Sequence, residues 1–79
     1  MKERTITVYG TGCKKCQQLH ANALEAAEQV KQPVSTEYVT DIMAISAAGI
    51  MSTPALAIDG QVVSTGKVLD VPTIVTLLG

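Results

Sequence analysis

The first half of the chain shows two hydrophobic periods in succession, which predict two strands on either side of a helix. Residues 5–9 alternate and are rich in β-branched side chains, as strands do. From residue 13 to about residue 31 the apolar positions recur every three or four residues, and Pro33 should end this helix. Residues 34–40 predict a second strand. The apolar stripe of the helix consists of Cys16, Leu19, Ala23, Ala27 and Val30, with Leu24 beside them.

Two further helices are predicted, each by a capping residue and apolar side chains. Asp41 is a suitable N-cap for a short helix over residues 42–48, which a glycine then ends. Asp70 would cap a last helix with Pro72 in its first turn, where the missing N–H of proline is tolerated. The side chains expected on the inner face of this last helix are Ile74, Val75, Leu77 and Leu78.

A β-hairpin is predicted between these two helices. Residues 55–58 and 61–64 read as strands, and Asp59-Gly60 between them suits a type I′ turn. The order of elements is therefore βαβαββα, in a single domain over residues 1–79. A strand–helix–strand unit implies parallel pairing through a right-handed crossover, and a hairpin adds an antiparallel edge. We expect an α/β fold with a four-stranded mixed sheet and helices on both faces.

Composition and charge narrow the classes of function. Apolar residues make up 47% of the chain and charged residues 16%, a usual globular balance. Tyr9 and Tyr38 are the only aromatic residues, so aliphatic side chains must fill the core. A net charge of −1 gives no reason to expect a nucleic-acid or membrane-surface partner. The N-terminus has no apolar signal-peptide region and no stretch could span a membrane, so we expect a cytoplasmic protein.

Two cysteines carry the candidate chemistry. Cys13 and Cys16 flank Lys14-Lys15 at the point where the first strand gives way to the helix. The reactive species is the thiolate, and a helix N-terminus favours an anion. Residues three apart on a helix have Cβ atoms about 5–6 Å apart, close to disulfide reach. In a reducing compartment such a pair is more often redox-active or metal-binding than structural. We predict that Cys13 is the exposed nucleophile and Cys16 the inward resolving thiol.

Other interpretations of these residues stay open at this stage. The pair could be a structural disulfide, although so short a loop removes little unfolded-state entropy, or two inert thiols, or a soft-metal site. Lys14 and Lys15 oppose the helix dipole, which is explained if they stabilise a thiolate or attract an acidic partner; they could equally be solvated surface. His20 could relay a proton or ligate a metal, or be an ordinary half-exposed histidine. Tyr9 could border the site or belong to the core.

The motifs together resemble the thioredoxin/glutaredoxin superfamily, and in particular its small prokaryotic redox-active disulfide proteins. The resemblance covers nearly the whole chain, and its anchors are Gly12-Cys13-Lys14-Lys15-Cys16, Thr53-Pro54-Ala55-Leu56 and Gly66. It implies a thioredoxin-like fold and a cis peptide bond at Thr53-Pro54 packed against the cysteines. It also implies that the backbone of Thr53 pairs with the substrate chain, with Pro54 and Gly12 beside it. Gly12 stands where thioredoxins carry tryptophan, and the two lysines stand where they carry Gly-Pro.

This resemblance implies a thiol–disulfide oxidoreductase that exchanges disulfides with a partner protein. No cofactor or metal is expected, only a reductase or thiol pool that resets the pair, and we expect a monomer. The alternative is a dithiol module that holds a soft metal or metalloid, such as Cu(I) or arsenite, without redox turnover. Copper-chaperone domains also begin strand–CxxC–helix. They carry methionine where Thr11 stands here, and they end in a strand where residues 70–78 predict a helix.

Overall fold

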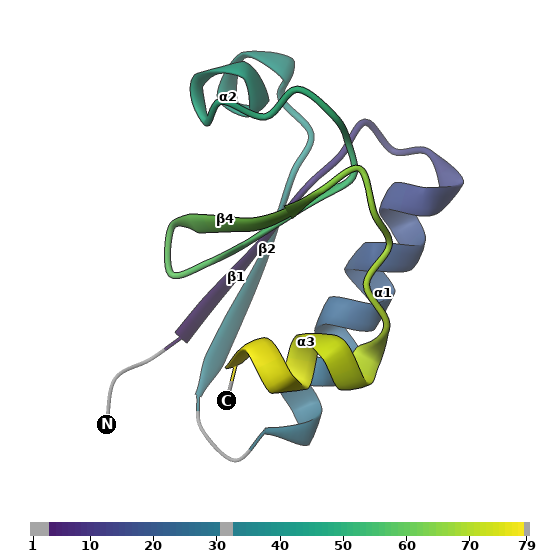
Figure 1. Ribbon diagram of the computed structural model, residues 1–79, viewed down its shortest axis with the longest axis vertical. Helices are drawn as coiled ribbons and strands as arrows, with labels where there is room; N and C mark the ends of the chain where they lie inside the picture. The colour runs from purple at the N-terminus through teal and green to yellow at the C-terminus, as the bar shows by residue number, and fades with distance from the viewer. Residues whose placement is uncertain (1–3, 31–32, 79) are drawn as a thin grey trace.

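The computed structural model describes residues 4–30 and 33–78, and it confirms the predicted order of elements (Figure 1). The strands and helices follow one another as β1 (Arg4–Tyr9), α1 (Lys14–Gln29), β2 (Val34–Val39), α2 (Ile42–Ala47), β3 (Ala55–Ile58), β4 (Gln61–Thr65) and α3 (Val71–Leu78).

The strands form one mixed sheet in the order β2-β1-β3-β4, as expected for this α/β fold. β1 pairs with β2 in parallel and with β3 in antiparallel register, and β4 continues antiparallel to β3. In this register Tyr9 lies opposite Ala55. The end of β1, from which the cysteine turn departs, therefore lies beside the start of β3.

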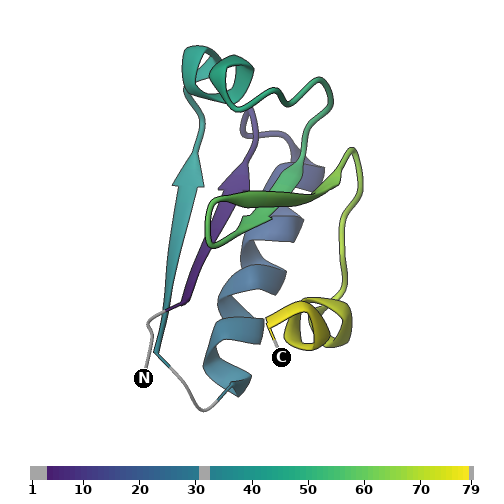
Figure 2. The same ribbon diagram turned by 60° about the vertical axis from the view of Figure 1, so that its left-hand side comes forward.

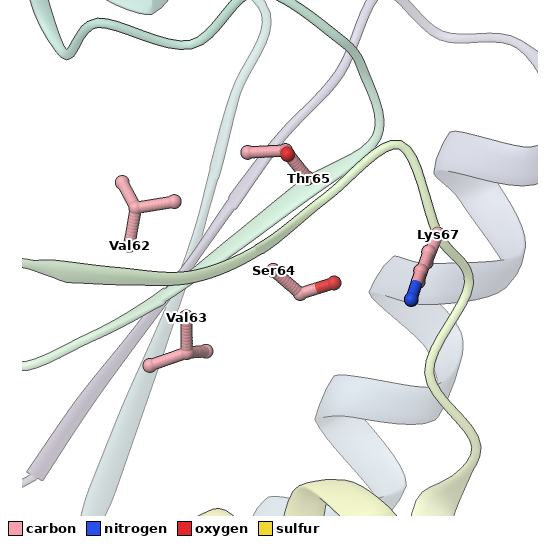
Figure 3. A pocket seen from close by; sticks show the side chains of 5 residues that line it. All are labelled: Val62, Val63, Ser64, Thr65 and Lys67. Atoms are coloured by element: carbon pink, nitrogen blue, oxygen red, sulfur yellow. The ribbon is translucent and has the colours of Figure 1, made fainter.

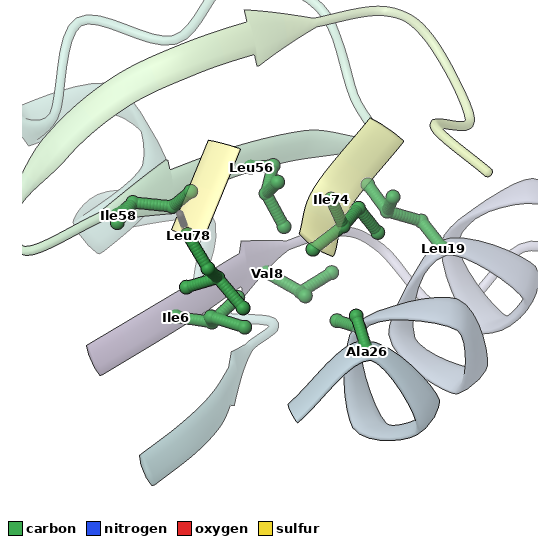
Figure 4. Packing of buried hydrophobic residues seen from close by; sticks show 9 residues of the cluster. Ile6, Val8, Leu19, Ala26, Leu56, Ile58, Ile74 and Leu78 are labelled. Carbon is green, nitrogen blue, oxygen red and sulfur yellow. The ribbon is translucent and has the colours of Figure 1, made fainter. Parts of the chain in front are cut away.

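The main core lies between one face of this sheet and two helices, α1 and α3 (Figure 2). Successive residues of a strand point to opposite faces, so Ile6 and Val8 of β1 share the face toward α1. These side chains pack with residues of β3 and of both helices (Figure 4). No aromatic ring is among the fully buried side chains of the described residues, as the composition required. The fully buried aliphatic members of this cluster include Ile6, Val8, Leu19, Leu56, Ile74 and Leu78.

The short helix α2 contacts the opposite face of the sheet, at one end only. Ile45 of α2 packs with Ile50 and Ala55 in a second, smaller cluster. Tyr9 and Val39, at the ends of β1 and β2, border this cluster. Figure 1 shows α2 beyond the ends of the strands. The expectation of helices on both faces is therefore met, with a small contribution from α2.

Some predicted inward positions are wrong. Leu77, expected on the inner face of α3, is 41% exposed. In α3 the buried residues are Ile74 and Leu78, four apart, and Leu77 is turned by about 100° from Leu78 on the helix surface. In α1 the buried stripe contains Ala26, while the predicted Ala27 is half-buried. Where apolar residues are adjacent in the sequence, the pattern does not indicate which of them faces the core.

The ends of several elements also differ from prediction by a residue or two. Cys13 is the N-cap of α1, so the helix begins one residue later than expected. It ends at Gln29, and Val30 is already extended with φ −86° and ψ 149°. Pro33 has no N–H to donate to the Gln29 carbonyl, four residues earlier, which agrees with its predicted role at this end of the helix. The predicted end near residue 31 lies outside the described residues. α2 and β2 each end one residue early, and β4 extends to Thr65.

The turn between β3 and β4 contacts the start of β1, at the end of the sheet far from the cysteines. Asp59 and Gly60 both have positive φ, 53° and 83°, as the predicted type I′ turn requires. The Asp59 carboxylate accepts a hydrogen bond from the backbone N–H of Thr5 and pairs with the Arg4 guanidinium. These contacts, the Thr5 hydrogen bond foremost, hold the pKa of Asp59 below its ordinary value. Arg4 also donates to the Leu78 carbonyl, 2.7 Å away, so the same group reaches α3.

We expect Ile74→Ala to destabilise the protein far more than Leu77→Ala. Ile74 is fully buried, and replacing a buried isoleucine by alanine costs about 2–5 kcal/mol in lost contacts and cavity formation. Leu77 lies on the same helix but is 41% exposed, so its truncation should cost well under half as much. Urea unfolding of both variants measures the difference. Equal losses would contradict the assigned orientation of α3.

Candidate active site

The two cysteines meet at the N-terminus of α1. Cys13 is the N-cap, with extended backbone, and its sulfur accepts a hydrogen bond from the backbone N–H of Cys16 at 3.4 Å. The sulfurs of Cys13 and Cys16 are 2.9 Å apart, and both residues are free thiols. Cys13 is exposed and Cys16 is fully buried. This difference in exposure is the one that the sequence predicted for a nucleophile and a resolving thiol.

The surroundings of Cys13 favour its thiolate. Its pKa is lowered from the ordinary value, mainly by the hydrogen bond with the Cys16 side chain and then by the backbone N–H of Cys16. The backbone N–H of Lys15 adds a smaller effect in the same direction, while partial burial opposes it. Donors in the first turn of a helix have no partner within the helix, so they are available to an anion at the N-cap.

Lys14 and Lys15 are exposed in this first turn. The hydrogen bonds around Cys13 already account for the direction of its pKa shift. A contribution of the two lysine charges to the thiolate, or to an acidic partner surface, therefore stays a prediction.

Gly10, the residue directly after β1, is a site residue that the sequence analysis did not identify. A β-carbon at this position would lie 2.6 Å from the Cβ and 2.7 Å from the Sγ of Cys16, distances that real β-carbons do not reach. It would also lie 3.3 Å from Cε1 of Tyr38. Gly10 donates its N–H to the Val39 carbonyl at 3.0 Å, which holds this backbone against β2. A glycine directly after a strand and before the cysteine turn was the available signal.

The loop before β3 lies next to this turn. The Thr53-Pro54 peptide bond is cis, as the resemblance implied, and the Pro54 side chain is fully buried. Because Tyr9 pairs with Ala55, Pro54 stands beside Gly10 at the same end of the sheet. The Pro54 carbonyl accepts a hydrogen bond from the N–H of Gly66 at 2.8 Å. This hydrogen bond connects Pro54 and Gly66, two of the residues on which the family resemblance rests.

Gly12 lies on the exposed side of the cysteine turn. It has a φ of 89°, in the region that favours glycine, and no atom beyond its chain neighbours approaches the place of a β-carbon within 4 Å. Its carbonyl accepts a hydrogen bond from the Gln17 side chain at 3.0 Å. The turn before Cys13 is thus open to an approaching molecule.

The aromatic residue near the dithiol is Tyr38, and Tyr9 lies elsewhere. Tyr9 borders the α2 cluster on the far face of the sheet. Tyr38 is on β2 opposite Val8, on the face toward α1, and its ring stacks on His20 with centroids 4.6 Å apart. His20 therefore contacts the tyrosine. The alternation of side chains along β2 could have indicated the position of Tyr38, since every second residue of this strand faces α1.

The sequence of this chain is similar to those of known proteins. The sequence profile described as the thioredoxin domain matches residues 4–79. The chain belongs to the thioredoxin family. It is 38% identical over 63 residues to a thioredoxin of Methanothermobacter thermautotrophicus, which covers 80% of this chain and 82% of that protein. It is 36% identical over 63 residues to a thioredoxin of Methanocaldococcus jannaschii, covering 80% of this chain and 72% of the relative.

Membership of the thioredoxin family confirms the resemblance and supports thiol–disulfide oxidoreductase activity for the CxxC pair. The described part of the chain has no cluster of three or more His, Cys, Asp or Glu side chains that could hold a metal ion. None of the described helices is long and apolar enough to cross a membrane.

A separate pocket lies on the edge strand β4 (Figure 3). Its volume is about 410 Å³, and neither cysteine lines it. The lining residues are Val62, Val63, Ser64, Thr65 and Lys67. This pocket therefore does not coincide with the dithiol site.

We expect a short pulse of iodoacetamide at neutral pH to label Cys13 and to leave Cys16 unmodified. Cys13 is exposed and has the lowered pKa, whereas Cys16 is fully buried. Mass mapping of the labelled peptides measures the order of reaction. If Cys16 were labelled first, the assigned roles would be reversed.

The pH dependence of this alkylation should show what lowers the pKa of Cys13. Cys16→Ala removes the largest cause and should raise the pKa, while Cys16→Ser keeps an O–H donor and should raise it less. The double variant Lys14→Gln/Lys15→Gln should raise it less than Cys16→Ala does. A larger effect of the double variant would assign the thiolate stabilisation to the lysine charges.

Gly10→Ala should disturb both stability and thiol chemistry. The added methyl group has to displace Cys16, and overpacking of this kind costs about 1–3 kcal/mol. Gly49→Ala is the control, since it introduces only left-handed backbone strain, about 1–2 kcal/mol, at a position with open space. Both variants should unfold at lower urea concentration, but only Gly10→Ala should alter the rate and pH dependence of Cys13 alkylation. Unchanged alkylation in Gly10→Ala would refute the contact.

Proposed function

We propose that this protein exchanges disulfides with a partner protein, with Cys13 as nucleophile and Cys16 as resolving thiol. The observation that carries the proposal is the pairing of an exposed cysteine of lowered pKa with a fully buried thiol 2.9 Å away. Family membership supports the same chemistry.

The exchange takes two steps. The Cys13 thiolate attacks one sulfur of the partner disulfide, forms a mixed disulfide and expels the other partner sulfur as a thiolate, which takes up a proton. Cys16 then attacks Cys13, the bond between Cys13 and the partner breaks, and the partner leaves as a dithiol. The protein is left with a Cys13–Cys16 disulfide, and a reductase or thiol pool returns it to the dithiol. The reverse sequence oxidises a partner dithiol.

We further propose that the partner chain lies along the loop before β3. The cis Thr53-Pro54 bond stands beside Gly10, at the end of the sheet from which the cysteine turn departs. The backbone of Thr53 would pair with the partner, and the open face of Gly12 would allow close approach. Lys14 and Lys15, exposed in the same turn, favour a partner with acidic residues near its disulfide. A cytoplasmic location and a monomeric state remain expectations.

Cys16→Ser should trap the partner as a mixed disulfide. In this variant Cys13 can attack, but no resolving sulfur follows, so a covalent adduct with a disulfide-bearing protein such as insulin should accumulate. Cys13→Ser should form no adduct, and the wild type should reduce insulin with turnover when dithiothreitol is supplied. Non-reducing gel electrophoresis and turbidity measure the two outcomes. A stable adduct through Cys16 in Cys13→Ser would contradict the assigned roles.

The soft-metal alternative is tested on the same reduced protein. Titration with Cu(I) and with zinc, read by thiolate absorbance and competition with a chelator, reports any dithiol site. Tight binding by a protein that fails to reduce insulin would replace the oxidoreductase proposal.

A further inference from the structure

Cys16 has to act as a nucleophile from a buried position. Its side chain is fully buried, and a thiol attacks a disulfide as the thiolate. When this attack takes place, the Cys13 sulfur is already bonded to the partner and can no longer exchange a proton with Cys16. A hydrogen-bond donor close to the Cys16 sulfur would therefore assist the second step.

Tyr38 is the aromatic side chain beside Cys16. The Cys16 sulfur and the edge of the Tyr38 ring both face Gly10, since a β-carbon there would lie 2.7 Å from the sulfur and 3.3 Å from Cε1 of the ring. The hydroxyl oxygen of Tyr38 is buried and makes no hydrogen bond with any described residue. Buried hydroxyl groups are almost always paired, because an unpaired one costs free energy.

The ionisation of Tyr38 is consistent with this location. Its pKa is raised, first by burial and then by the negative charge of Cys16, while the nearby backbone N–H of Gly12 opposes the rise. The hydroxyl is therefore neutral at physiological pH and keeps its proton. A neutral phenol can donate one hydrogen bond, and a thiolate is an acceptor.

The Tyr38 ring packs against α1. His20, one turn after Cys16, stacks on the ring with centroids 4.6 Å apart and an angle of 28° between the planes. The same helix thus holds the sulfur and the surface on which the tyrosine rests. The titratable side chains that the described contacts place around Cys16 are Cys13, with the sulfurs 2.9 Å apart, and Tyr38, on which His20 stacks. Gly10, directly after β1, separates these groups and carries no side chain.

We propose that the Tyr38 hydroxyl donates a hydrogen bond to the Cys16 thiolate during the second step, which makes Tyr38 a positioning residue for resolution. This inference rests on the proposed disulfide exchange. In the step, the Cys16–Cys13 bond forms and the Cys13–partner bond breaks, with the electron pair leaving on the partner sulfur. The proton lost by Cys16 ends on that sulfur, and Tyr38 retains its own.

The two steps can be separated with an aromatic disulfide reagent that releases a coloured thiolate. Cys13 releases one equivalent as it forms the mixed disulfide, and Cys16 releases the second as it resolves it. In Tyr38→Phe the first release should keep the wild-type rate and the second should be about threefold slower at neutral pH, with its pH midpoint raised by about one unit. The rate loss is smaller than tenfold because a thiolate of higher pKa is also a better nucleophile. At high pH the second release should recover.

Tyr9→Phe is the matched control, because Tyr9 loses the same hydroxyl on the opposite face of the sheet. It should leave both releases unchanged. Reduced Tyr38→Phe should be at least as stable as the wild type in urea, since the hydroxyl that it loses has no partner in the described structure. Equal slowing of both releases, or no change in the second, would overturn the proposal.

A titration that needs no exchange partner keeps this inference separate from the proposed function. In Cys13→Ser the remaining thiol is Cys16, and its ultraviolet absorbance reports the thiolate. Adding Tyr38→Phe should raise the midpoint by about one unit. His20→Phe keeps a ring for stacking and removes the imidazole, so a rise there without one in Tyr38→Phe would assign the effect to His20 and refute the role of Tyr38. A rise with Tyr38→Phe in a protein that does not reduce insulin would retain the inference and reject the proposed function.

Discussion

The first turn of α1 lies so close to the end of β1 that only a glycine fits between them. Gly10 contacts Cys16 on one side, and its N–H is held by the Val39 carbonyl on the other. This contact fixes the buried thiol against the sheet and leaves the N-cap, Cys13, on the surface. The asymmetry of the two cysteines therefore follows from a backbone contact. The hydrogen bonds around Cys13 then follow from the geometry of a helix N-terminus.

The elements on which this contact depends are held by a small aliphatic core. Side chains of β1 and β3 meet those of α1 and α3 on one face of the sheet, and α2 covers only the end of the other face. A chain of this size buries a modest share of its surface, so each fully buried isoleucine or leucine accounts for a large part of its stability. The main core thus lies on the side of the sheet that supports the buried thiol, and the exposed turn and the loop before β3 adjoin it.

Much of this could be predicted from the sequence, because the signals were local. The alternation in β1, the Asp59-Gly60 turn and the capping residues Asp41 and Asp70 each act over a few residues. The CxxC spacing places both cysteines within one turn at the start of a helix. The inward faces of α1 and α3 were less certain, since Leu77 beside Leu78 gives no indication of which one is buried. Gly10 and Tyr38 could not be assigned from local pattern alone. Their roles depend on how β2 lies beside β1 and how closely α1 approaches both.

The two tyrosines lie on opposite faces of the sheet, and the chain has no tryptophan. Each ring is therefore an optical probe of a different region without any label. Tyr38, beside the thiols, should have an emission that depends on the redox state of the pair, because thiolates and disulfides quench excited phenols at short range. Tyr9 reports instead on the packing of α2. In Tyr9→Phe, Tyr38 would be the one remaining tyrosine, and its fluorescence would report whether the cysteine pair is a dithiol or a disulfide.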